Sequence, residues 1–96
     1  DYYKAVYMED KKGQTFEGHI SSITSFGIFV ELDNGIEGLI RLSTLKDMYE
    51  YVESASLLVG QRTGRTFMLG QKVEVELVNV NVDAREIDFE MIEGGK

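Results

Sequence analysis

The chain has 96 residues and a mass of 10.9 kDa, which suits one domain and leaves no room for two independent cores. Its 43% hydrophobic and 28% charged residues are typical of a globular protein, and the absence of cysteine excludes disulfides, thiol nucleophiles and thiolate zinc sites. No apolar run reaches the roughly 18 residues of a membrane span, and no signal peptide is evident. We therefore expect a cytoplasmic domain that makes no contact with a membrane.

Charge is distributed unevenly along the chain. The net charge of -7 disfavours non-specific electrostatic binding to nucleic acid. Positions 54–73 nevertheless contain no acidic residue, whereas acidic residues dominate positions 74–93. The cations of the acid-free stretch are Arg62, Arg65 and Lys72. Because exposed charges are screened beyond about 8 Å at physiological salt, a local basic patch can act despite the negative total.

The first predicted element is a short helix or arm over positions 1–12. Tyr3, Tyr7 and Met8 lie close to one helical face, and the segment ends before Gly13, a common helix stop. We expect this arm to join a preceding domain, with a binding domain over 13–93 and a tail over 94–96.

Apolar residues that alternate with polar ones then predict three strands in a meander. The breaks between them are Thr24-Ser25 and the turn Asp33-Asn34-Gly35, which is too short to be a calcium loop. The predicted strands are 16–21, 27–32 and 36–42.

Two features are predicted between the third and fourth main strands. Thr44-Leu45-Lys46-Asp47 matches a capping box, which predicts a short helix through Met48 and Tyr49. Positions 57–69 resemble a hairpin whose tip, 62–65, is basic.

The last two main strands are predicted over 72–82 and 87–92. The apolar set of the first of them changes face at Leu77-Val78, which predicts a β-bulge. Five main strands with a short helix between the third and fourth predict an all-β, five-stranded OB-fold barrel. The alternative on pattern alone is an SH3-like barrel, which has shorter loops and no helix at that place.

Two side chains on the second and third strands are candidates for ligand binding. Phe29 faces opposite to Ile28 and Val30, so it points outward if these two form core, and an exposed ring can stack on a nucleobase. Arg41 faces opposite to its apolar neighbours and can bind phosphate or stack on a base. The alternatives are that the arm or a loop covers Phe29, and that Arg41 belongs to an ordinary solvated face.

The sequence offers little for catalysis. Positions 60–66 lack the lysine and the glycine spacing of a phosphate loop. Asp88 and Glu90 alternate with core residues, so a solvated face explains them better than acid–base chemistry. The single histidine, His19, is predicted to be a surface or RNA-facing side chain. We expect no catalytic residue, metal or other cofactor in this segment.

Two segments resemble one known family. Positions 18–43, GHISSITSFGIFVELDNGIEGLIRLS, resemble the first three strands of an S1-type RNA-binding domain. Positions 58–93, which end in IDFEMIE, resemble the form of this domain that closes the ribonuclease R branch of the ribonuclease II exonucleases. YMEDKKG at 7–13 resembles the join from the nuclease body.

The resemblance implies an OB barrel that binds single-stranded RNA with low sequence specificity. Phe26 and Phe29 match the family's two RNA-facing aromatic residues. Arg41 stands where the family usually has histidine, which keeps a planar cation but removes a pH switch. Asp83 and Arg85 are the nearest matches to an aspartate and an arginine that flank a glycine in the family, and this chain lacks that glycine. The predicted RNA-binding residues are Phe26, Phe29, Arg41, Arg65, Lys72, Asp83, Arg85 and His19.

The resemblance also implies a parent protein, a hydrolytic 3′-to-5′ exoribonuclease whose aspartates and magnesium lie in a separate body. This segment is then expected to be a monomer that binds RNA without cutting it, with the rest of the nuclease as its second partner. One alternative is a stand-alone S1-type protein that binds ribosomes or messages. Another is a protein-docking barrel that uses the acidic positions 74–93 against a basic partner.

For the RNA-binding reading, the expected salt dependence follows from the number of phosphate contacts. With about three such contacts, the logarithm of the affinity for single strands should fall with the logarithm of the salt concentration at a slope near -2.

Overall fold

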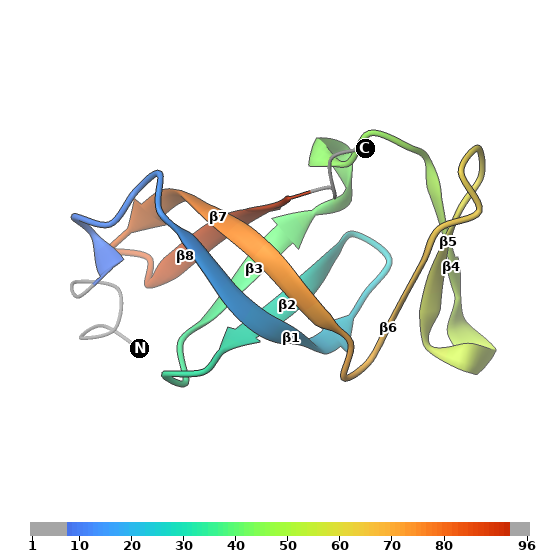
Figure 1. Cartoon of the computed structure of the whole chain (residues 1–96), viewed down its shortest axis with the longest axis horizontal. Coiled ribbons are helices and arrows are strands. Elements are labelled where there is room, and N and C mark those ends of the chain that lie inside the picture. Colours follow the sequence, from blue (N-terminus) through green and yellow to red (C-terminus); the bar gives the residue numbers. More distant parts are fainter. Residues whose placement is uncertain (1–7, 93–96) are drawn as a thin grey trace.

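Five strands close into a barrel in the computed structural model, which describes residues 8–92. Their order around the barrel is β1-β2-β3-β8-β7 (Figure 1). Neighbouring strands are antiparallel except β3 and β8, which are parallel. The barrel strands are β1 (Thr15–Ile23), β2 (Gly27–Leu32), β3 (Glu37–Arg41), β7 (Lys72–Asn81) and β8 (Glu86–Met91). The predicted all-β, five-stranded barrel is confirmed.

The core follows from the alternation of apolar residues along each strand. Ile28 and Val30 of β2 are fully buried, and so are Val75 and Leu77 of β7. Phe89 of β8 fills the space beside Gly38 of β3, where a Cβ atom would lie 2.7 Å from the phenyl ring. Because successive strand residues point to opposite faces, the residues between these positions form the outer surface.

Two β-bulges bend the barrel strands. The pairing of β7 with β8 shifts register between Leu77 and Asn79, so the predicted change of face is confirmed. The pairing of β1 with β2 shifts between Ile20 and Ser22, which is a second bulge that was not predicted. Bulges increase the local twist and so help a sheet of few strands to close.

A second, three-stranded sheet is inserted between β3 and β7 (Figure 1). Its strands are β4 (Tyr49–Val52), β5 (Leu57–Gly60) and β6 (Thr66–Met68), and the 3-10 helices η1 (Leu42–Thr44) and η2 (Glu53–Ala55) flank β4. The predicted hairpin is β5 with β6 and is confirmed. The predicted helical turn through Met48 and Tyr49 is wrong, since Tyr49 begins β4.

Asp47 explains why the capping-box prediction fails. Its carboxylate accepts hydrogen bonds from the backbone N–H groups of Met48 at 2.7 Å, Arg62 at 3.1 Å and Thr63 at 2.9 Å. It also accepts the Thr63 hydroxyl at 2.9 Å, and a Cβ atom on Gly60 would lie 2.5 Å from the same carboxylate. The carboxylate therefore binds the hairpin tip instead of a helix N-terminus.

The Asp47 carboxylate should make the hairpin sensitive to acid. The backbone hydrogen bond from Thr63 is the largest cause that lowers the pKa of Asp47 below its ordinary value of 3.8. A lowered pKa in the folded state means that the ionised form stabilises the fold above that value, and that this contribution is lost as the pH falls through the folded pKa. Asp47→Asn should therefore lower the free energy of unfolding more at pH 7 than at pH 3, which lies below the ordinary value.

Urea titration at both pH values measures this difference. Asp10→Asn is the matched control, because the side chain of Asp10 is 85% exposed and only approaches Lys11 at 3.7 Å. An equal loss of stability at pH 7 and pH 3 would show that the Asp47 charge is not the cause.

The segment before β1 packs against the barrel. Met8 is fully buried, and the Gly13 N–H donates to the Leu77 carbonyl at 2.8 Å. Positions 1–7 of the predicted arm and the predicted tail at 94–96 lie outside the described residues. Between residues 8 and 92, no helical segment has the length and apolarity that crossing a bilayer demands.

Candidate nucleic-acid interface

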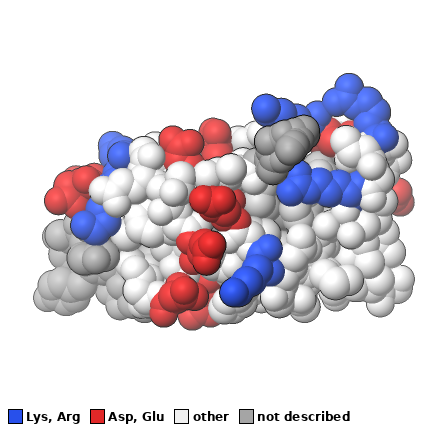
Figure 2. All heavy atoms as spheres, viewed as in Figure 1, with Lys and Arg blue, Asp and Glu red and all other residues white. Residues whose placement is uncertain are grey.

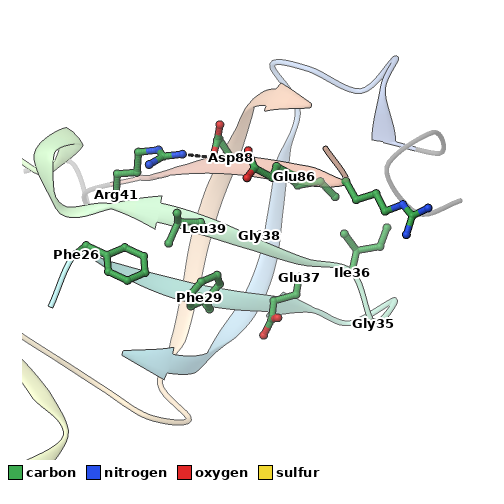
Figure 3. A pocket seen from close by; sticks show the side chains of 12 residues that line it. Phe26, Phe29, Gly35, Ile36, Glu37, Gly38, Leu39, Arg41, Glu86 and Asp88 are labelled. Atoms are coloured by element: carbon green, nitrogen blue, oxygen red, sulfur yellow. Dashed lines mark ion pairs between the residues drawn. The ribbon is translucent and has the colours of Figure 1, made fainter. Parts of the chain in front are cut away.

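The outer faces of β2, β3 and β8 form a groove with a volume of about 600 Å³ (Figure 3). Its lining combines aromatic and aliphatic side chains with charged ones of both signs. The residues of this groove are Phe26, Phe29, Gly35, Ile36, Glu37, Gly38, Leu39, Arg41, Arg85, Glu86, Ile87 and Asp88.

Two phenylalanines form an aromatic ledge in the groove. Phe29 is half-buried between the fully buried Ile28 and Val30, so the prediction that it points out of the barrel is confirmed. Phe26 is 57% exposed in the turn before β2, where Thr24 Oγ1 accepts its backbone N–H at 3.2 Å. The two rings are nearly perpendicular, at 87°, with centroids 6.4 Å apart. The ledge thus offers apolar ring surface to a ligand.

Arg41 stands at the end of β3 beside this ledge (Figure 3). Its side chain is 54% exposed, and its Nη2 atom lies 3.8 Å from Asp88 Oδ1 across the β3–β8 seam. Asn79 Nδ2 donates to the other Asp88 oxygen at 3.4 Å, which helps to hold that carboxylate in place. The guanidinium is therefore oriented by one carboxylate while half of the side chain remains open to solvent.

Arg85 lines the other end of the groove. It precedes β8, and because β8 runs parallel to β3, Arg85 lies at the end where β3 begins and Arg41 at the end where β3 stops. The backbone of Arg85 has φ of 59°, a left-handed conformation that costs a residue with a Cβ atom about 1–2 kcal/mol. The turn thus keeps arginine at a position that favours glycine.

We expect Arg85→Gly to separate stability from binding. Glycine relieves the left-handed strain but adds freedom to the unfolded chain, so the net gain in stability should be below about 1 kcal/mol. The same change removes a cation from the groove and should weaken RNA binding a few-fold. Thermal melting and a fluorescence titration with a labelled oligoribonucleotide measure the two effects. Arg85→Ala, which removes the cation but keeps the strain, is the control, and a glycine variant that is less stable than it would contradict the strain argument.

The other four predicted site residues lie outside this groove. His19 on β1 is exposed, with Nε2 3.6 Å from Glu31 Oε1, and Lys72 lies opposite it in the β1–β7 register. Asp83 is exposed in the turn between β7 and β8. Arg65 lies just before β6 of the second sheet, with Cζ 5.0 Å from the centre of the Phe67 ring. The structure therefore brings Phe26, Phe29, Arg41 and Arg85 together.

Three carboxylates of the groove were not predicted as site residues. Glu37 accepts the Ser21 hydroxyl, Asp88 pairs with Arg41, and Glu86 lies at the start of β8. Glu37 shares a strand face with Leu39 and Arg41, which is a signal present in the sequence. Within residues 8–92, no three acidic or histidine side chains come together in a way that could hold a metal ion.

Comparisons with known proteins agree with this geometry. The family model "S1 RNA binding domain" matches residues 9–92. The chain is 46% identical over 90 residues to ribonuclease R 1 of Lactococcus lactis, covering 93% of this chain and 11% of that protein. It is 44% identical over 94 residues to ribonuclease R of Escherichia coli, covering 96% of this chain and 12% of that protein.

A solved structure shares the fold as well. Mycoplasma genitalium RNase R in complex with ribose methylated single-stranded RNA superposes with a TM-score of 0.89 at 30% identity, over 95% of this chain and 14% of that one. The chain thus spans only a small part of each relative's length. From the family match and the barrel together, this chain belongs to the S1 RNA-binding domain family.

Proposed function

We propose that the chain binds single-stranded RNA by stacking bases on Phe26 and Phe29 while Arg41 and Arg85 hold phosphates. The observation that carries the proposal is the aromatic ledge in a groove with an arginine at each end. Base stacking on aromatic side chains contributes about 1–3 kcal/mol per base and tolerates any sequence, because every base has a π face. The solved complex of the Mycoplasma relative with single-stranded RNA supports this ligand.

The acids of the groove should keep the affinity modest. Asp88 is already paired with Arg41, so an incoming phosphate has to exchange for a carboxylate. Glu37 and Glu86 stand in the same groove and repel phosphate. Association itself costs about 4 kcal/mol or more, which offsets much of the stacking energy. Useful affinity then depends on tethering to a larger protein.

We propose that the larger protein is a ribonuclease R-like 3′-to-5′ exoribonuclease of the cytoplasm. Residues 13–93 are its RNA-gripping domain, residues 1–12 the join to its nuclease body, and 94–96 a tail. The relatives support the proposal that this chain is part of such a nuclease, since the match to ribonuclease R covers nearly the whole chain. His19, Lys72, Arg65 and Asp83 remain predicted RNA contacts outside the groove, and the monomeric state remains a prediction.

The experiment is a titration with a uridine tetranucleotide at several salt concentrations, followed by amide chemical shifts. Shifts should centre on Phe29, Leu39 and Arg41. With two phosphate contacts in the groove, log affinity should fall with log salt at a slope of about -1.4, from about -0.7 per phosphate. A flat salt response, or shifts that avoid these residues, would contradict the proposal.

A second candidate function is docking to a basic protein surface. Four glutamates face outward on β1, β7 and β8 and form what we term the acidic stripe: Glu17, Glu74, Glu76 and Glu90. Glu17 lies directly opposite Glu74, and Glu76 directly opposite Glu90, although like charges in such positions destabilise a sheet. If docking is the function, adding ribonuclease R that lacks its own S1 domain should change the amide chemical shifts of the acidic stripe. The chemical shift of Phe29 should then stay the same.

A further inference from the structure

We infer that the second sheet carries a phosphate-binding site that extends the path of the RNA beyond the groove. The site is formed by Lys46, before β4, and Arg62, at the tip between β5 and β6. It rests on the proposed function, because it lengthens the same interface. Its ligand is the sugar-phosphate backbone of a single strand that already occupies the aromatic ledge.

The geometry holds these two cations beside a shallow hollow of about 550 Å³. Arg62 is 77% exposed, yet its Nη2 atom donates to the Lys46 carbonyl at 2.8 Å and its Nε atom lies 3.8 Å from Asp47 Oδ1. These two contacts with residues 46 and 47 thus orient the guanidinium, while most of the side chain faces solvent. A cation that is already oriented loses less entropy when it binds a phosphate.

Among the described residues that line this hollow, the one acid is turned inward. The Asp47 side chain is only 4% exposed, and its carboxylate accepts the backbone N–H groups of Arg62 and Thr63. Glu37, in contrast, is exposed in the groove. The exposed charged side chains among the described lining residues, Lys46 and Arg62, are therefore both cations, and Figure 2 shows basic side chains gathered over the end of the molecule that carries the second sheet.

The chain places Lys46 close to one end of the groove. The aromatic ledge accommodates about two bases, whereas OB folds cover about 4–16 nucleotides, so a longer strand has to continue beyond the ledge. The acidic stripe repels phosphate on the β1–β7 side, and Figure 2 shows acidic side chains in a row across the middle of the barrel. Beyond the end of β3 at Arg41, Lys46 follows within five residues, at most about 18 Å away.

The test compares a uridine tetranucleotide with a dodecanucleotide. Two groove cations predict a salt slope of about -1.4 for the short strand, and Lys46 and Arg62 should make the slope for the long strand steeper by about 1.4. In the double variant Lys46→Gln/Arg62→Gln, the slope for the dodecanucleotide should become shallower by about 1.4 and its affinity should fall by about tenfold, with the tetranucleotide unaffected. Comparing variants at one strand length removes effects of strand ends.

Two further variants keep the result interpretable. Lys46→Arg/Arg62→Lys retains both charges and should retain the steep slope, which separates loss of charge from damage to the hairpin. Lys11→Gln/Lys12→Gln removes two charges from the segment at the opposite end of the barrel and should change neither slope (Figure 1).

A dodecanucleotide slope that the Lys46→Gln/Arg62→Gln variant leaves unchanged would overturn the inference. If that variant instead loses its affinity for a nuclease body but keeps its affinity for RNA, the hollow is a protein-docking site, which also overturns the inference. Failure of the tetranucleotide to bind, or its indifference to Phe29→Ala, would count against the proposed function of the groove and not against the second site alone.

Discussion

Replacing Phe29 by alanine should lower the affinity of the chain for a short oligoribonucleotide by roughly 5- to 150-fold. This range corresponds to the loss of one base stack, about 1–3 kcal/mol. Phe29 lies on the outer face of β2, whose neighbouring residues fill the core without it, so the barrel should remain folded. Fluorescence anisotropy with a labelled uridine oligonucleotide measures the affinity, and circular dichroism confirms the fold.

Met68→Ala is the control for Phe29→Ala. Met68 is also a large exposed side chain, at 50%, but it lies on β6 of the second sheet and does not line the groove. Its replacement should leave the affinity for a short strand unchanged. Equal effects of the two substitutions, or no effect of Phe29→Ala, would show that the ledge does not bind bases.

Replacing Phe89 by alanine should have the largest effect on stability. Phe89 is 1% exposed, and its ring packs directly over Gly38 at the seam between β3 and β8. Loss of a buried phenyl ring costs about 3–5 kcal/mol, a large share of the 5–15 kcal/mol that stabilises a typical domain. The variant should therefore unfold at much lower urea concentration than the parent chain.

Phe29→Ala serves as the control for Phe89→Ala, since it removes the same atoms from the outer surface of the barrel and not from its core. It should shift the urea midpoint only slightly. A loss below about 1 kcal/mol for Phe89→Ala would mean that the seam tolerates a cavity, and that this ring does not hold the barrel closed.

The sequence predicts those parts of the fold that depend on local alternation. The parity of β2 places Phe29 outside, and the change of face near Leu77 marks the bulge in β7. The bulge in β1 has a weaker signal, the odd spacing of the two buried residues Ile20 and Ile23. Strand β4 was missed, although Tyr49 and Tyr51 alternate with their neighbours, because a capping-box pattern precedes them.

The failures share a physical cause, which is that distant residues decide the local structure. The Asp47 carboxylate binds Arg62 and Thr63, fifteen and sixteen residues later, and this tertiary contact overrides the helix signal. Glu86 and Asp88 reach the groove through the parallel contact between positions 39 and 88, which no local pattern predicts. A count of cations likewise cannot tell that the Arg65 guanidinium lies over Phe67 while that of Arg41 lies at the ledge.

The seam between β3 and β8 has a mechanical consequence. It is held in register by one residue pair, Leu39 with Asp88, whereas β2 and β3 are joined by five pairs. Amide exchange should therefore begin there when the domain breathes. A ligand that contacts both β3 and β8 should hold the two strands together, so amide exchange along this seam should slow as the groove fills.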